Sequence, residues 1–316
     1  MAERLLKPSD LPDTLWRSGE SMLVLPADLR RAYCRMLEDK GLMEAARNAT
    51  ADDGPVGGIK EEDTRRHFAT RFASSSARVQ LASLDPKDSL RNASDLFLKA
   101  FSGGRIGLLD IPCGAGAASA ALLGCIMELR KAKVLPREPL EVFLIYGDIS
   151  IYAREYAGEL LTEMRAELER EGILVREKAM PWDVLNAEST TDILHAWMDW
   201  ARDCHEYFVI MANFSGFLQG EGKFNDAKAQ LDEIIRWAGT RRSSVLWIEP
   251  QTNMAVKGLI PRVLKWLGLK LPSRFMPTWA PETSIALSDA IFQHPVKPDY
   301  RPLVQLNLIR LEASAP

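Results

Sequence analysis

Cysteine and histidine are scarce in this sequence, and long apolar runs are missing from it. The four cysteines, Cys34, Cys113, Cys125 and Cys204, are far apart, and no pair has the Cys-x-x-Cys spacing of a zinc or redox site. No apolar run approaches the ~20 residues of a membrane helix, and the first residues lack the apolar stretch of a signal peptide. We therefore expect a cytoplasmic protein with reduced thiols, no metal site and no membrane segment.

An excess of positive charge is also missing. Lys and Arg number 40 against 43 Asp and Glu, which gives a net charge of −3 and a pI near 5.9. This balance argues against binding of nucleic acid through bulk electrostatics, although a local basic face stays open. The 316 residues, 47% of them hydrophobic, suffice for one large core or for a core domain with a smaller helical cap.

The pattern of apolar residues changes near residue 104. Before this point the sequence is polar and helical in period, with expected helices over 25–46, 61–84 and 89–101. From 105 onward, short apolar runs alternate with longer helical stretches, which predicts an α/β fold with a parallel sheet covered on both faces. We assign 1–103 to a helical N-terminal cap and 104–316 to the α/β domain.

Seven strands are expected in that sheet. The first five lie at 106–111, 140–146, 173–178, 207–212 and 244–248, with helices expected at 117–133, 151–171, 190–204, 225–238 and 255–267. The last two, 284–292 and 303–311, are separated by a Pro-rich turn with no room for a helix, so they must pair as an antiparallel hairpin.

A glycine-rich turn follows the first run. Asp110, Pro112, Gly114 and Gly116 lie between an expected strand and an expected helix. Glycine suits such a turn because it adopts positive φ and lets the backbone approach a ligand closely. An ordinary strand-to-helix turn is the alternative.

This turn resembles motif I of the class I S-adenosylmethionine-dependent methyltransferases, and the resemblance extends over about 105–311. It implies a Rossmann-like fold and S-adenosylmethionine as cofactor. Pro112, Gly114 and Gly116 would line its methionyl and ribose parts, and Asp110 would orient the turn or meet the ligand's ammonium. We expect Gly116→Val to abolish cofactor binding in a folded protein. A nicotinamide oxidoreductase is disfavoured because Ser119 replaces the third glycine of its fingerprint.

Acidic residues at the ends of the next two strands extend the expected cofactor site. Asp148, beside Ile149, can accept two hydroxyl hydrogen bonds from a ribose diol, or else cap the following helix. The resemblance implies that Asp183 accepts from the adenine amino group while Trp182 or Val184 packs on the ring. A surface turn with a half-buried Trp is the alternative there.

Two further strand ends supply candidate catalytic residues. Asn213 follows the fourth strand, in the place of the family's motif IV, where polar residues beside an aromatic one position the acceptor. In that fold the fourth strand ends beside the sulfonium, so the resemblance implies that Asn213 is a cofactor-binding residue as well. Phe214 and Ser215 replace the two prolines of the amino-directed methylases, which puts base-nitrogen methylation in doubt. Glu249 ends the fifth strand and is a candidate acceptor-side group. The alternative for Asn213 is a structural cap, and the alternative for Glu249 is a solvated acid in a turn.

Arginines and aromatics are interleaved on the helix expected over 61–84. We expect this helix to complete the pocket, with Arg71 or Arg78 near the cofactor carboxylate or the acceptor. The alternative is that these arginines form a solvated helix face. Such a face could also bind phosphates and stack bases. The chain faintly resembles the ribosomal small-subunit-associated methyltransferase-like family as well, without that family's iron–sulfur cysteines.

Three functions therefore stay open. A small-molecule methyl acceptor is slightly favoured because the whole chain is acidic, and RNA is the alternative acceptor. The third is a catalytically degenerate methyltransferase fold that acts as a binding or assembly factor.

Overall fold

The computed structural model describes residues 4–50, 58–90, 93–219, 223–239, 242–251, 275–277 and 286–313. The helix expected over 255–267 and the first two residues of the expected hairpin lie outside these ranges. Within them, no helix is long and apolar enough to cross a membrane.

Five parallel strands form the centre of the sheet, as the apolar runs predict. They are β3 (Gly104–Asp110), β4 (Leu140–Asp148), β5 (Ile173–Pro181), β6 (Glu206–Ala212) and β7 (Ser243–Pro250). Alternate residues of one strand face opposite sides: Phe208 and Ile210 of β6 lie in one hydrophobic core, Val209 and Met211 in the other. The run is continuously apolar because both faces of the strand are buried.

The expected antiparallel hairpin is present, but the sheet has ten strands rather than seven. β9 (Ala286–Gln293) and β10 (Leu303–Ala313) pair with each other, and β10 also pairs antiparallel with β7. The order along the sheet is β1-β2-β9-β10-β7-β6-β3-β4-β5, with β8 (Phe275–Pro277) beside β10.

The strands β1 (Trp16–Arg17) and β2 (Met22–Val24) correct the expectation that the N-terminal segment is purely helical. β2 pairs parallel with β9, so the N-terminal hairpin extends the sheet beyond its closing strands. Strands of two and three residues are too short to show a period of two in the sequence.

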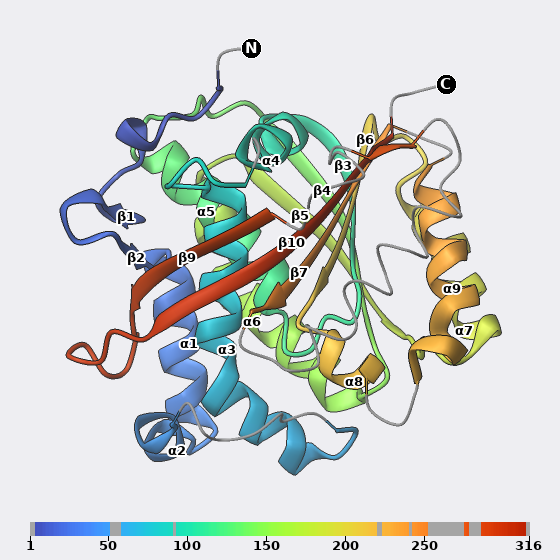
Figure 1. Ribbon diagram of the computed structural model, residues 1–316, viewed down its shortest axis with the longest axis horizontal. Helices are drawn as coiled ribbons and strands as arrows, with labels where there is room; N and C mark the ends of the chain where they lie inside the picture. Colours follow the sequence, from blue (N-terminus) through green and yellow to red (C-terminus); the bar gives the residue numbers. More distant parts are fainter. Residues whose placement is uncertain are drawn as a thin grey trace.

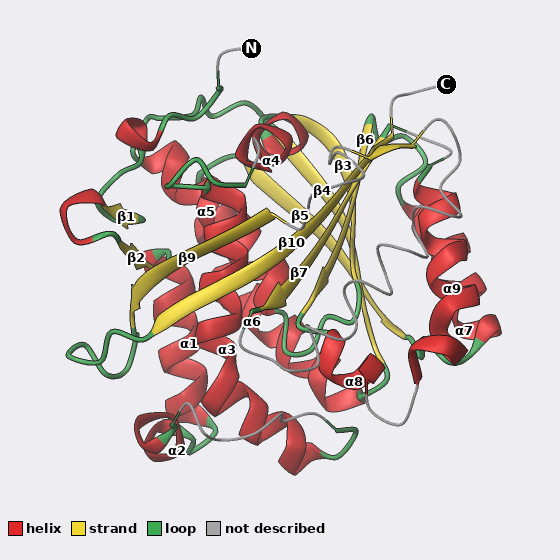
Figure 2. Cartoon of the chain, in the orientation of Figure 1, coloured by secondary structure: helices red, strands yellow, loops and turns green. Residues whose placement is uncertain are grey.

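Helices cover both faces of the sheet (Figures 1 and 2). On one side lie α1 (Ala27–Asp39), α3 (Glu61–Leu84), α5 (Ala117–Lys131) and α6 (Ile151–Arg170), and on the other lie α7 (Ala187–Trp200) and α9 (Lys223–Ala238). Three shorter helices are α2 (Met43–Asn48), α4 (Ala93–Phe101) and α8 (Ser215–Gln219).

Helix α3 crosses the molecule as a core element. It packs against α5 and against the β2, β7, β9 and β10 strands. The rings of Phe68 and Phe72 are fully buried, and both contact Tyr33, with centroids 5.1 and 4.9 Å away. Gln80 Nε2 donates to the carbonyls of Leu15 and Val24 at 3.0 and 2.8 Å, which joins α3 to the N-terminal hairpin.

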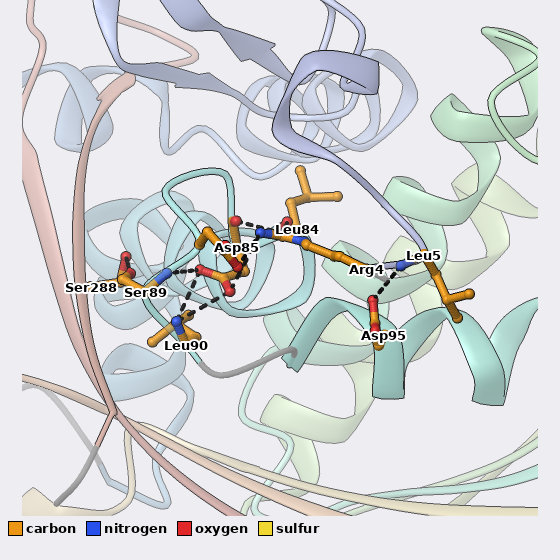
Figure 3. Close-up of polar contacts among 9 residues, drawn as sticks. Arg4, Leu5, Leu84, Asp85, Ser89, Leu90, Asp95 and Ser288 are labelled. Atoms are coloured by element: carbon orange, nitrogen blue, oxygen red, sulfur yellow. Dashed lines mark hydrogen bonds and ion pairs between the residues drawn. The ribbon is translucent and has the colours of Figure 1, made fainter. Parts of the chain in front are cut away.

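The C-terminal end of α3 is held by a buried carboxylate and by the start of the chain (Figure 3). Asp85 adopts a left-handed conformation with φ of 42°, and its Oδ1 accepts from the N–H groups of Ser89 and Leu90 at 2.9 and 3.1 Å. Arg4 donates to the carbonyls of Leu84 and Asp85 at 2.8 and 2.6 Å. Helix carbonyls that have no intrahelical partner are thereby satisfied, which fixes the helix that borders the site.

Candidate functional site

A cavity of about 440 Å³ opens at the carboxyl ends of the parallel strands. Its size lies in the range typical of small-molecule sites, and its place is where open α/β sheets bind ligands. The turns after β3, β4, β5 and β6 line it together with α3. The lining residues are Gly58, Ile59, Asp63, Thr64, His67, Ser75, Pro112, Cys113, Gly114, Ala115, Ala117, Ala118, Asp148, Ile149, Ala153, Trp182, Asp183, Val184, Leu185, Ala212, Asn213, Phe214, Phe217 and Lys223.

The glycine turn exposes its backbone to the cavity at Gly114. This residue has φ of +52°, and a Cβ built on it would meet only His67 Cε1, at 3.9 Å. Among the described residues, the space above this backbone is therefore open. Pro112 and Cys113 line the same wall. Burial raises the pKa of the Cys113 thiol well above its ordinary value, so the thiol is protonated at neutral pH.

Gly116, in contrast, is not among the lining residues. With φ of +80°, it precedes α5, and a Cβ on it would lie 3.0 Å from both Cα and Cβ of Ala157 in α6. The absence of a side chain here allows two helices to pack closely. The sequence leads us to expect that Gly116→Val loses the cofactor in an intact fold. From this packing we instead expect Gly116→Val to destabilise the fold.

Asp110 lies beneath the turn and does not line the cavity. Its Oδ2 accepts from the N–H of Ser119, in the first turn of α5, at 3.1 Å, and its buried Oδ1 has no hydrogen-bond partner among the described residues. Burial raises the pKa of Asp110 to about 7. Of the two roles implied for it, orienting the turn is the one this position suits.

Asp148 joins the end of β4 to the glycine turn and lines the cavity. Its Oδ2 accepts from the N–H of Gly114 at 3.0 Å, and its Oδ1 accepts from the N–H of Ser150 at 2.9 Å. Burial raises the pKa of this carboxyl. The cap of α6 is Ser150, whose Oγ accepts from the N–H of Ala153 at 3.3 Å, so the alternative role of Asp148 as helix cap is not what is observed.

The loop after β5 forms the next part of the wall. Trp182 is buried, and its Nε1 donates to Thr190 Oγ1 at 3.2 Å. Asp183 Oδ1 accepts from the N–H of Leu185 at 2.9 Å. Ile149 and Leu185 are exposed apolar residues on the lining. The residues expected around an adenine ring therefore come together, with an apolar rim beside them.

The two candidate catalytic residues are placed differently. Asn213 lines the cavity, and its Oδ1 accepts from Arg78 Nη1 at 3.1 Å. Glu249 does not line the cavity. Its Oε1 accepts from the N–H groups of Phe214 and Ser215, both at 2.8 Å, and it is completely enclosed, which raises its pKa. Glu249 therefore supports the loop that carries Asn213 and is remote from solvent.

Helix α3 lines the cavity through Asp63, Thr64, His67 and Ser75, which confirms that this helix completes the pocket. Thr64 Oγ1 lies 3.3 Å from Ser150 Oγ, which ties α3 to the start of α6. Burial, with the neighbouring positive charge of Arg71, lowers the pKa of His67 to about 4, so its imidazole is neutral at neutral pH. Arg71 itself is not among the lining residues.

The aromatics interleaved with these arginines are core residues. Phe68 and Phe72 are fully buried, and Phe68 also packs edge-on against Tyr156 at 5.0 Å. They cannot stack nucleic-acid bases, so this part of the proposed RNA-binding face is wrong. The spacing alone does not distinguish a core stripe from a binding stripe, because both repeat at the period of a helix.

Several lining residues carry no sequence signal that identifies them. Phe217 is 39% exposed and stacks on Phe214 at 5.6 Å, and Lys223 Nζ lies 4.6 Å above the Phe217 ring. Ile59 is exposed on the lining. Thr64 and His67, three residues apart, and Ser75, about three turns after Thr64, share one face of α3, which is the one signal that the sequence gives for them.

Comparison with known families finds no matching family, and comparison with curated proteins finds no match. Among solved structures, the chain is similar to a protein from Clostridium thermocellum provisionally described as an rRNA methylase, with 12% identity and a TM-score of 0.35 over 72% of this chain and 97% of that one. It is also similar to the 16S rRNA methyltransferase RmtF in complex with S-adenosyl-L-homocysteine, with 16% identity and a TM-score of 0.33 over 99% and 100% of the two chains.

Proposed function

We propose that this protein is an S-adenosylmethionine-dependent methyltransferase. The observation that carries the proposal is the hydrogen bond between Asp148 and the N–H of Gly114 on the wall of one cavity. This contact places a carboxylate, which can accept from hydroxyl groups, beside an open stretch of backbone. A ligand whose sugar hydroxyl groups bind the carboxylate and whose chain lies along the open backbone would suit this arrangement.

The residues present fit this cofactor. Gly114 leaves the space that a side chain would fill, and Asp148 keeps lone pairs for hydroxyl groups beyond its two backbone bonds. Trp182, Asp183 and Ile149 would hold the base. When bound, the cofactor supplies an electrophilic methyl group on a sulfonium.

The protein's own contribution is positioning and exclusion of water. Among the lining residues, His67 is a neutral imidazole and Cys113 a protonated thiol, and Glu249 is enclosed behind the loop that carries Asn213. Methyl transfer to a nucleophilic acceptor needs alignment of the reacting atoms more than it needs a strong base. Ile149 and Phe214 add apolar surface to the lining, which would limit water around a bound ligand.

For the acceptor, a small molecule is our first candidate, because the aromatics of α3 are buried and a cavity is available. RNA is the second candidate, because Phe217 is an aromatic residue of the lining that is 39% exposed and could contact a nucleobase. A degenerate fold that only binds remains the third.

The test has two stages. Calorimetry with S-adenosyl-L-homocysteine should show binding, and its absence in the folded protein would remove the proposal. Incubation with methyl-labelled S-adenosylmethionine and either total RNA or a small-metabolite extract should then label one pool. Cofactor binding with label in neither pool would favour the degenerate fold over both acceptor classes.

A further inference from the structure

One polar contact joins α3 to the loop after β6, across 135 positions of sequence. Arg78 Nη1 donates to Asn213 Oδ1 at 3.1 Å. The guanidinium is largely buried, and its Nε has no hydrogen-bond partner in the described part of the chain. Burial lowers the pKa of Arg78 to about 10, and the negative charge of Glu249 partly offsets this effect.

The chemistry of arginine determines which end of the Asn213 amide faces it. A guanidinium can only donate hydrogen bonds, so the carbonyl oxygen of the amide must point to Arg78. The NH2 group is the other end of the same planar unit. No described residue accepts a hydrogen bond from Asn213 Nδ2, and this atom is not enclosed, while the Asn213 side chain lines the cavity.

The backbone of the loop fixes the amide further. Asn213 has φ of 58°, in the left-handed region, and its N–H donates to the carbonyl of Ile248 at 2.9 Å. The next two N–H groups, of Phe214 and Ser215, donate to Glu249. Three consecutive backbone bonds thus hold the loop, so the NH2 group is preorganised toward the cavity.

On the methyl-transfer function proposed above, we infer that Asn213 offers the substrate a hydrogen-bond donor, and that Arg78 is the positioning residue that imposes this polarity. An asparagine that receives a substrate amino group must accept from it through Oδ1, and here that atom faces Arg78. The substrate group that meets Asn213 is therefore a carbonyl, a carboxylate or a ring nitrogen adjacent to the reacting atom. Primary amines are disfavoured as methyl acceptors.

The sharpest variant is Asn213→Asp. Aspartate tolerates the left-handed conformation and forms an ion pair with Arg78, so the fold is retained, while the cavity side changes from donor to acceptor. We expect unchanged affinity for S-adenosyl-L-homocysteine within about threefold and an unfolding midpoint no lower than that of the wild type. Label transfer to total RNA or to the small-metabolite extract should fall at least 50-fold. The matched control is Asn48→Asp, at an exposed position at the end of α2, which should leave all three readouts unchanged.

Substitution of Arg78 separates positioning from mere support of the fold. Arg78→Lys keeps a charged group that only donates, so most of the transfer should be retained. Arg78→Met removes the donor, lets the amide turn over and should reduce transfer at least tenfold, also when the rate is compared at a temperature where both variants are folded. Equal losses in the two variants would contradict the positioning role.

The methylated product gives a readout that needs no variant. Digestion of the labelled product and mass spectrometry should place the methyl group on an atom other than a primary amine. A methylated primary amine, or full transfer by Asn213→Asp, would overturn the inference while the proposed function stands. Failure of the wild type to bind S-adenosyl-L-homocysteine or to label either pool would overturn the proposed function, and this inference with it.

Discussion

Asp148 accepts a hydrogen bond from the backbone N–H of Gly114 at 3.0 Å, which links the end of the second parallel strand to the turn after the first. The second carboxylate oxygen holds the N–H of Ser150 at the start of α6. One side chain thus organises two of the turns that line the cavity.

Substitution of Asp148 by alanine should weaken binding of S-adenosyl-L-homocysteine by about 1.5–3 kcal/mol, because charge-assisted bonds to the ligand's hydroxyl groups and the support of the turn are both lost. Isothermal calorimetry measures this. Asp199→Ala, which removes a carboxylate that is 77% exposed and paired with Arg202, is the matched control and should bind like the wild type. Equal affinities in the two variants would show that no ligand lies on Asp148.

The two glycines of the turn should respond in opposite ways. Gly114→Ala places a methyl group in open cavity space, with a conformational cost of about 1 kcal/mol for the left-handed backbone, so the fold should survive while affinity for S-adenosyl-L-homocysteine falls tenfold or more. Gly116→Ala forces a methyl group against the backbone of Ala157 and should lower the free energy of unfolding by about 2 kcal/mol or more. Urea denaturation and calorimetry on both variants measure the contrast, and the reverse pattern would place the ligand at Gly116.

The sequence predicts the central architecture because β3 to β7 are buried on both faces, and continuous apolar runs between helical stretches have few other interpretations. It predicts that the strand-end residues gather at one edge, since parallel strands end together. It does not predict which of them turn inward. Asp110 and Glu249 look equivalent to Asp148 in the sequence, yet only Asp148 lines the cavity.

Contacts between segments that are far apart in the sequence cannot be predicted from local sequence patterns, for a different reason. The pairing of Arg78 with Asn213 depends on how α3 lies against the sheet, and no local pattern encodes that placement. The same is true of β2, whose three residues acquire a strand conformation by pairing with β9 at the far end of the chain. Local propensity is a weak guide where tertiary pairing decides the conformation.

Asp110 should make the stability of the protein depend on pH. Its pKa is about 7 in the folded protein, against an ordinary value of 3.8, so between these values the folded chain holds a proton that the unfolded chain has released. The contribution of Asp110 to the free energy of unfolding should therefore decrease as pH rises from about 4 to about 7, by on the order of 2 kcal/mol between pH 5 and 8, whereas the lowered pKa of His67 acts in the opposite direction. Asp110→Asn keeps an oxygen acceptor for the N–H of Ser119 and removes the titration, so the free energy of unfolding of the wild type minus that of the variant should decrease by this amount over the range. Urea denaturation at several pH values gives both curves, and parallel curves would contradict the assignment.

Glu249 offers a test that separates support of the loop from proton transfer. Its Oε1 holds the N–H groups of Phe214 and Ser215 and Nε1 of Trp247, the last at 2.7 Å. Glu249→Ala leaves these three buried donors without a partner, at about 1–3 kcal/mol each, and should unfold the protein at a much lower urea concentration. Glu249→Gln keeps an acceptor and removes only the charge opposite Arg78, so it should be moderately destabilised and should retain methyl transfer within about tenfold. Loss of transfer by several orders of magnitude in a stable Glu249→Gln variant would instead identify Glu249 as the proton acceptor of the reaction.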